Sequence, residues 1–168
     1  MRVLRLVFVA CLCALSASAQ AATAPRLSVA SLSDLNVPSA PYDEKANANA
    51  AVDAAVARAK KDGKLVLIDL GGNWCPDCRI LAGLMELPKM RAFLDAHYEM
   101  VSVDVGRFNR NLQIPARYGI TQRLEGVPAI LVVTTDGRLV NAGRVSAIQD
   151  ARHMTPQTLA DWLAQWTP

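Results

Sequence analysis

The sequence predicts an α/β fold in which helices cover both faces of a central mixed β-sheet. Three segments indicate the main strands. Residues 65–70 and 129–134 are short apolar runs, which are typical of strands covered on both faces. Residues 99–105 show the two-residue alternation of a strand. Helical segments separate these strands, so the expected order is helix, strand, helix, strand, helix, strand, strand, helix.

The first half of the chain supplies helices on either side of the first strand. Residues 42–62 are rich in alanine, end in two lysines and precede Gly63, as expected of a helix with cations near its C-terminal pole. A turn after the strand leads to a helix that opens at 74–76. Pro88 cannot continue that helix, so a break before it and a second helix over 88–96 are expected.

The second half contains a long connection, a hairpin and a last helix. Residues 106–126 form a polar connection with a short helix expected at 115–118. Asp136-Gly137 is a hairpin-turn signal, which predicts that 139–142 pairs with the preceding strand. Thr155-Pro156 combines an N-cap residue with a proline at the first helical position, and the leucines and tryptophans that follow share one helix face.

The N-terminus has the pattern of a secretory signal peptide. A short basic start is followed by an apolar run at 6–15 and by small residues, with Ala17 and Ala19 as the cleavage box. The apolar run is about half the length that a membrane-spanning helix needs. Cys11 loosely resembles a lipoprotein cysteine, but it lies too early in the run. We therefore expect cleavage of residues 1–19 and a periplasmic location.

Removal of the signal peptide changes what composition implies. Two of the four cysteines leave with it, and the formal net charge falls from +3 to +1. No basic stripe with interleaved aromatic residues is present, so binding to nucleic acid is not indicated. Residues 20–41 are rich in Ala, Ser and Pro and predict a flexible lead-in. Residues 42–168 are then long enough for one domain with its own core.

The remaining cysteines form the motif Trp74-Cys75-Pro76-Asp77-Cys78, placed where a buried strand turns into a helix. Cys75 would cap the helix, where free backbone amides and the helix dipole stabilise a thiolate. Cys78, one turn further, would be shielded. One exposed thiolate that attacks and one protected thiol that resolves the mixed disulfide are what thiol–disulfide exchange requires.

Two structural explanations compete with this redox interpretation. A disulfide between residues three apart closes almost no loop, so it would stabilise the fold little. A zinc site needs about four ligands, and only His97 and His153 remain as further soft ligands. We expect neither a metal nor a cofactor, and redox chemistry is favoured over both alternatives.

Four segments in order resemble the thioredoxin family: 68–70 and 74–78 match its strand and active-site turn, 103–105 its next strand, and 126–129 its cis-proline loop. The resemblance implies a thioredoxin fold over about residues 45–168. It also implies that the chain is a protein thiol–disulfide oxidoreductase that acts on thiols and disulfides of other proteins.

The resemblance also implies roles for individual residues. Asp69 would be the buried carboxylate that moves the proton of the resolving cysteine, and the alternative is a strand-end Asp bonded to a turn. Pro128 would be cis, and the backbone of Val127 would pair with an extended substrate segment. Trp74 would belong to the docking surface, with a place in the core as the alternative.

Three features depart from the family pattern. Met100 stands where the family usually carries a lysine near the buried Asp, and Gly83 stands where a proline kinks the active-site helix. The connection at 106–126 is also longer than usual, which leaves its role and the substrate surface open.

The residues between the cysteines favour the reducing direction. Asp77 repels a neighbouring thiolate and should raise its pKa, with Arg79 offsetting part of this effect. Pro76 removes an amide that could contact the sulfur. A thiolate that is not strongly stabilised predicts a middling or reducing potential. The alternative is an oxidant that forms disulfides in the periplasm.

A reductase in an oxidising compartment needs electrons, and the resemblance implies a membrane donor of the DsbD type. We expect a monomer. Isomerases usually add a dimerisation domain, for which this chain has no room, so an isomerase is not favoured. Two further alternatives are a binding or chaperone module whose cysteines only gate an interface, and a metal or copper chaperone that uses Met100 or His97.

Overall fold

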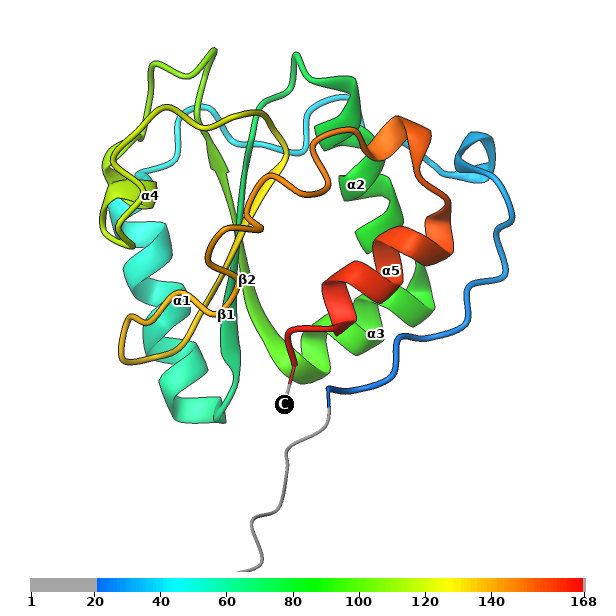
Figure 1. The fold of residues 1–168 in the computed structure, drawn as a ribbon, viewed down its shortest axis with the longest axis horizontal. Helices are drawn as coiled ribbons and strands as arrows, with labels where there is room; N and C mark the ends of the chain where they lie inside the picture. Colours follow the sequence, from blue (N-terminus) through cyan, green and yellow to red (C-terminus); the bar gives the residue numbers. More distant parts are fainter. Residues whose placement is uncertain (1–20, 168) are drawn as a thin grey trace, which may run out of the picture.

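The computed structural model describes residues 21–167, so the predicted signal peptide at 1–19 lies outside the described residues. A three-stranded mixed sheet forms the centre of the molecule (Figure 1), and its strands lie in the order β2-β1-β3. β1 runs parallel to β2 and antiparallel to β3. The strands are β1 (Leu65–Gly71), β2 (Tyr98–Asp104) and β3 (Ala129–Val133).

Helices cover both faces of this sheet, which confirms the predicted α/β class. Figure 1 shows α1 and α4 on one side and α2, α3 and α5 on the other. The helices are α1 (Ala48–Asp62), α2 (Pro76–Met85), α3 (Pro88–His97), α4 (Gln113–Ala116) and α5 (Pro156–Ala164). Short 3-10 turns occupy Leu32–Asp34 and Ala151–His153. None of the helices in the described part of the chain has the length and apolar character needed to cross a membrane.

The sheet separates two apolar clusters. Val66, Ile68 and Leu70 of β1 face the cluster under α1. Leu67, on the opposite face of the same strand, belongs to the cluster that α2, α3 and α5 cover. Because β1 is central and apolar on both faces, its last residues are held firmly, and the turn that follows β1 has a fixed position.

The helices follow the local signals, with two shifted starts: α1 begins later than expected, and α4 begins at Gln113, two residues before the expected 115–118. α2 stops before α3 because Pro88 occupies the first turn of α3. α1 ends at Gly63, whose φ of 68° is the left-handed conformation that glycine adopts readily. α1 begins at Ala48, six residues later than expected, because the side chain of Asn47 caps the helix and accepts a hydrogen bond from the Ala50 N–H at 3.1 Å.

The expected fourth strand at 139–142 does not form. Only a single bridge joins Leu139 to Val133. The buried side chain of Asn141 then takes over the pairing, since it accepts from the Val132 N–H at 2.9 Å and donates to the Ile130 carbonyl at 2.7 Å. A side-chain amide that satisfies the edge of β3 replaces a backbone ladder there.

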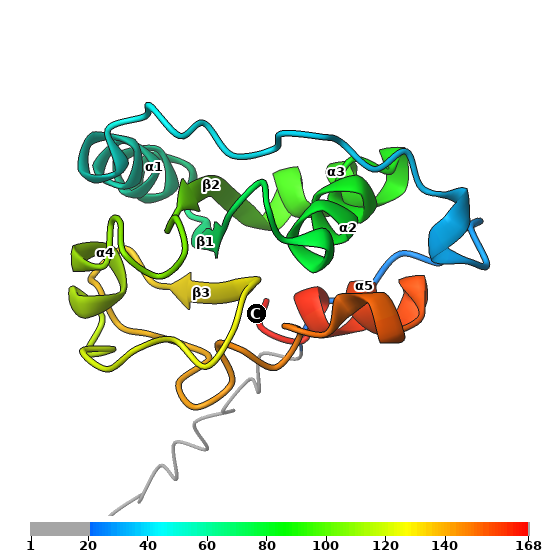
Figure 2. The same cartoon turned by 90° about the horizontal axis from the view of Figure 1, so that it is seen from above.

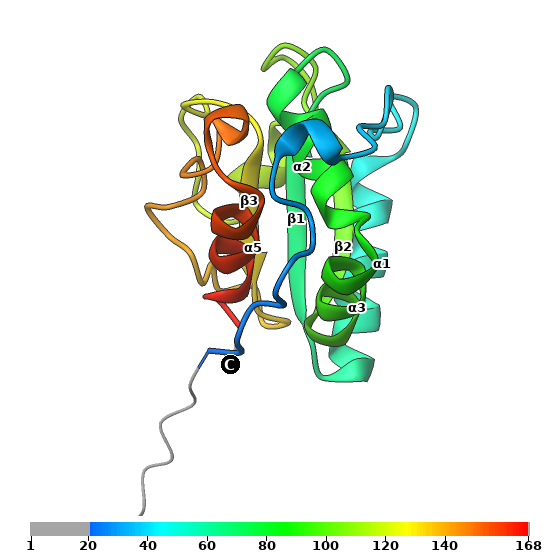
Figure 3. The same cartoon turned by 90° about the vertical axis from the view of Figure 1, so that its right-hand side faces the viewer.

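The N-terminal segment 21–41 is packed against the domain, in contrast to the flexible lead-in that its composition indicates. Leu35 is buried in the cluster beneath α2, α3 and α5. The Pro38 carbonyl accepts from Arg79 Nε at 2.9 Å, and Gln157 Oε1 accepts from the Leu27 N–H at 3.1 Å. Figure 3 shows the segment passing along α5 and α3, and Figure 2 shows it continuing past α2 towards α1.

Gly83 makes this close packing possible. A Cβ at this position would come within 2.9 Å of the Asn36 carbonyl oxygen, so a larger residue in α2 would push the segment away. The glycine that departs from the family pattern therefore lies directly beneath the N-terminal segment.

Candidate functional site

The candidate site lies at one edge of the sheet, where β1 and β2 end and β3 begins. Because β1 and β2 are parallel, their carboxyl ends share this edge, and antiparallel β3 starts there. The turn after β1 leads directly into α2, whose N-cap residue is Cys75. The loop before β3 contains Val127 and Pro128, and the peptide bond between these two residues is cis.

The two cysteines form a reduced pair at the start of α2. Cys75 Sγ accepts a hydrogen bond from the Cys78 N–H at 3.3 Å, as an N-cap side chain does. The Cys75 thiol also donates to the Val127 carbonyl, at an S···O distance of 3.4 Å. Cys78 is fully buried, as expected, whereas Cys75 is only 3% exposed and thus more enclosed than predicted. Its contact with the Val127 loop explains this difference.

The two thiols have very different acidities. A hydrogen bond with Cys78 is the main factor that lowers the pKa of Cys75 to about 7, and it outweighs both burial and the charge of Asp77. The pKa of Cys78 is raised, because its hydrogen bond with Cys75, its burial and the charge of Asp69 all favour the thiol. Near neutral pH, Cys75 is therefore the nucleophile and Cys78 keeps its proton.

Asp69 is a buried carboxyl near the end of β1, only 2% exposed. Burial is the main cause that raises the pKa of Asp69 to about 7, the hydrogen bond from Tyr42 opposes the rise, and a Cys75 thiolate adds to it. The Tyr42 hydroxyl donates to Asp69 Oδ2 at 2.8 Å. Within the described residues, Asp69 Oδ1 has no hydrogen-bond partner, so it is not the turn-bound Asp of the alternative interpretation.

Asp77 is compensated by a cation that sequence reasoning did not identify. The Arg152 N–H donates to Asp77 Oδ1 at 2.9 Å, and the Arg152 guanidinium binds both carboxylate oxygens. Burial opposes ionisation of Asp77, but these hydrogen bonds outweigh it and hold the pKa of Asp77 below its usual range. Arg79, which was expected to offset the charge of Asp77, instead donates to the Pro38 carbonyl.

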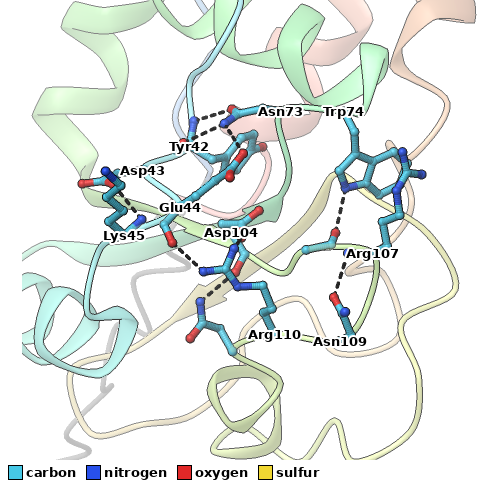
Figure 4. Close-up of polar contacts among 12 residues, drawn as sticks. Tyr42, Asp43, Glu44, Lys45, Asn73, Trp74, Asp104, Arg107, Asn109 and Arg110 are labelled. Carbon is cyan, nitrogen blue, oxygen red and sulfur yellow. Dashed lines mark hydrogen bonds and ion pairs between the residues drawn. The ribbon is translucent and has the colours of Figure 1, made fainter.

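Trp74 lies on the surface beside Cys75 and not in the core, since it is 40% exposed. Its indole N–H donates to the Gly106 carbonyl at 2.7 Å, a contact drawn in Figure 4. The guanidinium carbon of Arg107 lies 4.9 Å from the centre of the Trp74 ring, and the ring of Phe108 meets it edge-on at 6.1 Å. The start of the long 106–126 connection therefore forms part of the rim of the site.

The residues around the start of α2 are tied together by polar contacts (Figure 4). Asn73 Oδ1 accepts from the Tyr42 N–H and Asn73 Nδ2 donates to the Tyr42 carbonyl, both at 2.9 Å. Arg110 donates to the Glu44 carbonyl at 2.6 Å and pairs with Asp104 at 3.0 Å. The turn that carries Trp74 is thus braced by the chain before α1 and by the chain after β2.

Sequence reasoning identified the residues that follow one another along the chain and missed those that arrive from elsewhere. Tyr42 and Arg152 have no local motif, although Tyr42 is an isolated aromatic residue at the end of a polar segment. The histidines named as possible metal ligands lie apart from the cysteines: His97 packs on Phe93, and His153 pairs with Asp150. Among residues 21–167, no group of three potential metal ligands comes together.

An α/β sheet with a reduced cysteine pair at the N-cap of a helix, one thiol acidic and the other buried, defines the class of thiol–disulfide oxidoreductases. The sequence profile of the thioredoxin-like family matches residues 47–135. The chain belongs to this family, and it is a thioredoxin-like thiol–disulfide oxidoreductase.

Two known proteins show the extent of the similarity. The crystal structure of a disulphide isomerase from Xylella fastidiosa Temecula1 superposes with a TM-score of 0.68 at 38% identity, covering 74% of this chain and 94% of that one. The thiol:disulfide interchange protein DsbD 1 of Pseudomonas aeruginosa is 35% identical over 91 residues, which make up 52% of this chain. The matched part is only 14% of the length of DsbD 1.

Proposed function

We propose that this protein is an exported enzyme that reduces disulfide bonds in protein substrates through Cys75 and Cys78. The observation that carries the proposal is the asymmetry of the two thiols at the start of α2. Cys75 has a pKa of about 7, whereas the pKa of buried Cys78 is raised. A thiol whose pKa is near the ambient pH is the best attacking group, and a shielded thiol resolves the intermediate.

The reaction has two exchange steps. The Cys75 thiolate attacks one sulfur of the substrate disulfide, so a mixed disulfide forms and the other substrate sulfur leaves as a thiolate that takes up a proton. Cys78 then passes its proton to the Asp69 carboxylate and attacks Cys75 Sγ. The bond between Cys75 and the substrate breaks, and the substrate is released with both sulfurs reduced. The enzyme is left with a Cys75–Cys78 disulfide.

The reducing direction is supported by the acidity of Cys75. A reactive thiol with a pKa of about 7 is typical of thioredoxin, whereas that of the strong oxidant DsbA lies near 3.5. The more the thiolate is stabilised, the more the reduced form is favoured and the more oxidising the pair becomes. The hydrogen bond with Cys78 lowers the pKa of Cys75 to about 7, and burial and the charge of Asp77 oppose a further fall.

Substrate would be bound at the rim around Cys75. The Val127–Pro128 loop contacts the Cys75 thiol, so its backbone lies where a bound segment could pair with it. The exposed face of Trp74 supplies apolar contact area next to the reacting sulfur. We assign docking to Trp74, Val127 and Pro128, and tuning of the thiolate to Pro76 and Asp77.

Regeneration requires a dithiol donor that supplies two electrons and two protons. The similarity to part of DsbD 1 supports a membrane donor of the DsbD type, and the signal pattern at 1–19 supports action in the periplasm. We propose that the protein acts as a monomer. A second candidate activity is disulfide isomerisation, because the Xylella fastidiosa protein, 94% of which this chain covers at 38% identity, is a disulphide isomerase.

A direct test is the reduction of insulin by the mature chain with a dithiol donor present. The wild-type protein is expected to accelerate the reaction, and Cys75→Ser is expected to abolish the acceleration. Refolding of a protein with scrambled disulfides tests isomerisation on the same samples. A wild-type rate equal to that of Cys75→Ser in both assays would contradict an oxidoreductase of either kind.

A further inference from the structure

The buried carboxyl that receives the proton of Cys78 has an unusual environment. The salt bridges found among residues 21–167 do not involve Asp69, whose one hydrogen bond comes from a neutral phenol, that of Tyr42. Met100 is partly buried, packs against the apolar cluster under α2, α3 and α5, and contributes no charge. Whatever orients Asp69 in this protein must therefore come largely from Tyr42.

Tyr42 is held firmly in the place from which it reaches Asp69. Its side chain is 2% exposed, and both polar groups of its backbone are bound by the side chain of Asn73 at 2.9 Å. Figure 4 shows this pair of contacts between Tyr42, in the segment before α1, and Asn73 in the turn that precedes the cysteines. Tyr42 is thus tied by two hydrogen bonds to the turn that carries the cysteines.

Gly71 provides the space in which Tyr42 and Cys78 meet. A Cβ on Gly71 would overlap the Tyr42 hydroxyl oxygen and lie 2.9 Å from Cys78 Sγ. The phenol oxygen and the resolving sulfur therefore face the same bare stretch of backbone at the end of β1. The pKa of the phenol is raised by burial and by the charges of Asp69 and Cys78, so the hydroxyl remains a donor at neutral pH.

We propose that Tyr42 is a positioning residue for the resolving step: its hydroxyl holds Asp69 Oδ2 and leaves Oδ1 free to take the proton of Cys78. This inference rests on the proposed function. The proton moves from Cys78 Sγ to Asp69 Oδ1, the Cys75–Cys78 bond forms, and the bond from Cys75 to the substrate sulfur breaks. Tyr42 remains protonated throughout, and it acts by orienting Asp69 and by stabilising its charge.

The reagent DTNB separates the two steps when it is mixed with the reduced mature chain. Attack by Cys75 releases one coloured thiolate, and attack by Cys78 on the mixed disulfide releases a second. In Tyr42→Phe the pKa of Asp69 should rise, because the hydrogen bond that stabilises the carboxylate is lost. The pH midpoint of the second release is then expected about one unit higher than in the wild type, with the first release unchanged.

Tyr98→Phe is the matched control. Tyr98 is also a buried tyrosine, but its hydroxyl donates to the Leu163 carbonyl at 2.8 Å. Its backbone pairs with Leu65, at the end of β1 that lies away from the site. This variant loses a buried hydrogen bond without touching Asp69. Both releases are expected to keep the wild-type pH profile, which separates a positioning role from general destabilisation.

Each outcome decides the proposal. Superimposable second-release profiles for Tyr42→Phe and wild type would overturn it. If Tyr42→Phe does not fold, Asn73→Ala is measured instead, because it keeps the Tyr42 hydroxyl but frees the Tyr42 backbone. An upward shift in the pH midpoint of the second release is again expected. An unshifted profile would overturn the proposal. A wild-type chain that releases only one thiolate would contradict the proposed Cys75–Cys78 chemistry itself.

Discussion

Arg152, which is partly exposed, forms an ion pair with Asp77, the buried carboxylate between the two cysteines of the motif. The Arg152 backbone N–H and side chain both donate to the carboxylate of Asp77, at distances from 2.9 to 3.0 Å for the N–H and Nε contacts. The negative charge of Asp77, which stands between the two cysteines in the sequence, is therefore compensated by Arg152. The pKa of Cys75 is lowered mainly by its hydrogen bond with Cys78, and the charge of Asp77 opposes this effect.

Replacing Arg152 should make Cys75 less acidic. In Arg152→Gln the negative charge of Asp77 is no longer compensated, so we expect the pKa of Cys75 to rise above 7, by up to about one unit. The rate of alkylation by iodoacetamide as a function of pH measures this midpoint. Arg91→Gln, which breaks exposed ion pairs on α3, is the control and should leave it in place. An unchanged midpoint in Arg152→Gln would show that Asp77 has no effect on the thiolate.

Removing the resolving cysteine should trap substrates. In Cys78→Ser the mixed disulfide at Cys75 cannot be resolved, so we expect covalent complexes with disulfide-containing proteins that survive a non-reducing gel. Cys75→Ser should form none, because Cys78 is fully buried and its pKa is raised. Equal trapping by both variants would reverse the assigned order of the cysteines.

Asp69 should make the stability of the reduced protein depend on pH. Its carboxyl has a usual pKa of 3.8, and in the folded chain burial raises the pKa of Asp69 to about 7. Between these values the folded protein holds one more proton than the unfolded chain. The resulting contribution to stability is fully present below the unfolded pKa and is lost as the pH rises through the folded one.

Asp69→Asn removes this dependence. The wild type should lose stability between about pH 4 and about pH 8, and the variant should not. The free energy of unfolding of Asp69→Asn minus that of wild type should therefore increase over this range by an amount on the order of 4 kcal/mol. Urea unfolding of both reduced proteins at the two pH values checks the difference. Parallel pH dependence would mean that Asp69 titrates normally in the folded state.

The packed N-terminal segment should contribute to stability. Leu35→Ala removes a buried side chain from the cluster under α2, so we expect the free energy of unfolding to fall by about 2 kcal/mol or more. Leu112→Ala, at a leucine that is 41% exposed, should change it by less than about 0.5 kcal/mol. Equal small effects in a denaturant titration would indicate that residues 21–41 are the loose lead-in suggested by their composition.

Local patterns predicted much of the fold and the centre of the site. The N-cap position of Cys75, the break before Pro88 and the start of α5 at Thr155-Pro156 depend on residues within a few positions of one another. The class of the sheet followed from the apolar runs. These features are predictable because capping, proline geometry and strand periodicity act over short stretches of chain.

The partners of the site were not predictable in the same way. Tyr42 and Asp69 are 27 positions apart in the sequence, and Arg152 and Asp77 are 75 positions apart. No local sequence pattern around Tyr42 or Arg152 predicts these contacts. The prediction of a fourth strand was wrong for a related reason. The side-chain amide of Asn141 hydrogen-bonds to the edge of β3, in place of the backbone pairing that the hairpin signal predicted. Such contacts depend on the assembled tertiary structure.

The equilibrium redox potential of the Cys75–Cys78 pair in the mature chain, measured against thiol–disulfide buffers, tests the central claim most directly. A Cys75 pKa of about 7 predicts a two-electron transition at or below about −200 mV, in the range of thioredoxin-like reductants. A potential near about −120 mV, as in DsbA, would contradict the reducing direction, and the absence of a reversible transition would contradict the redox pair.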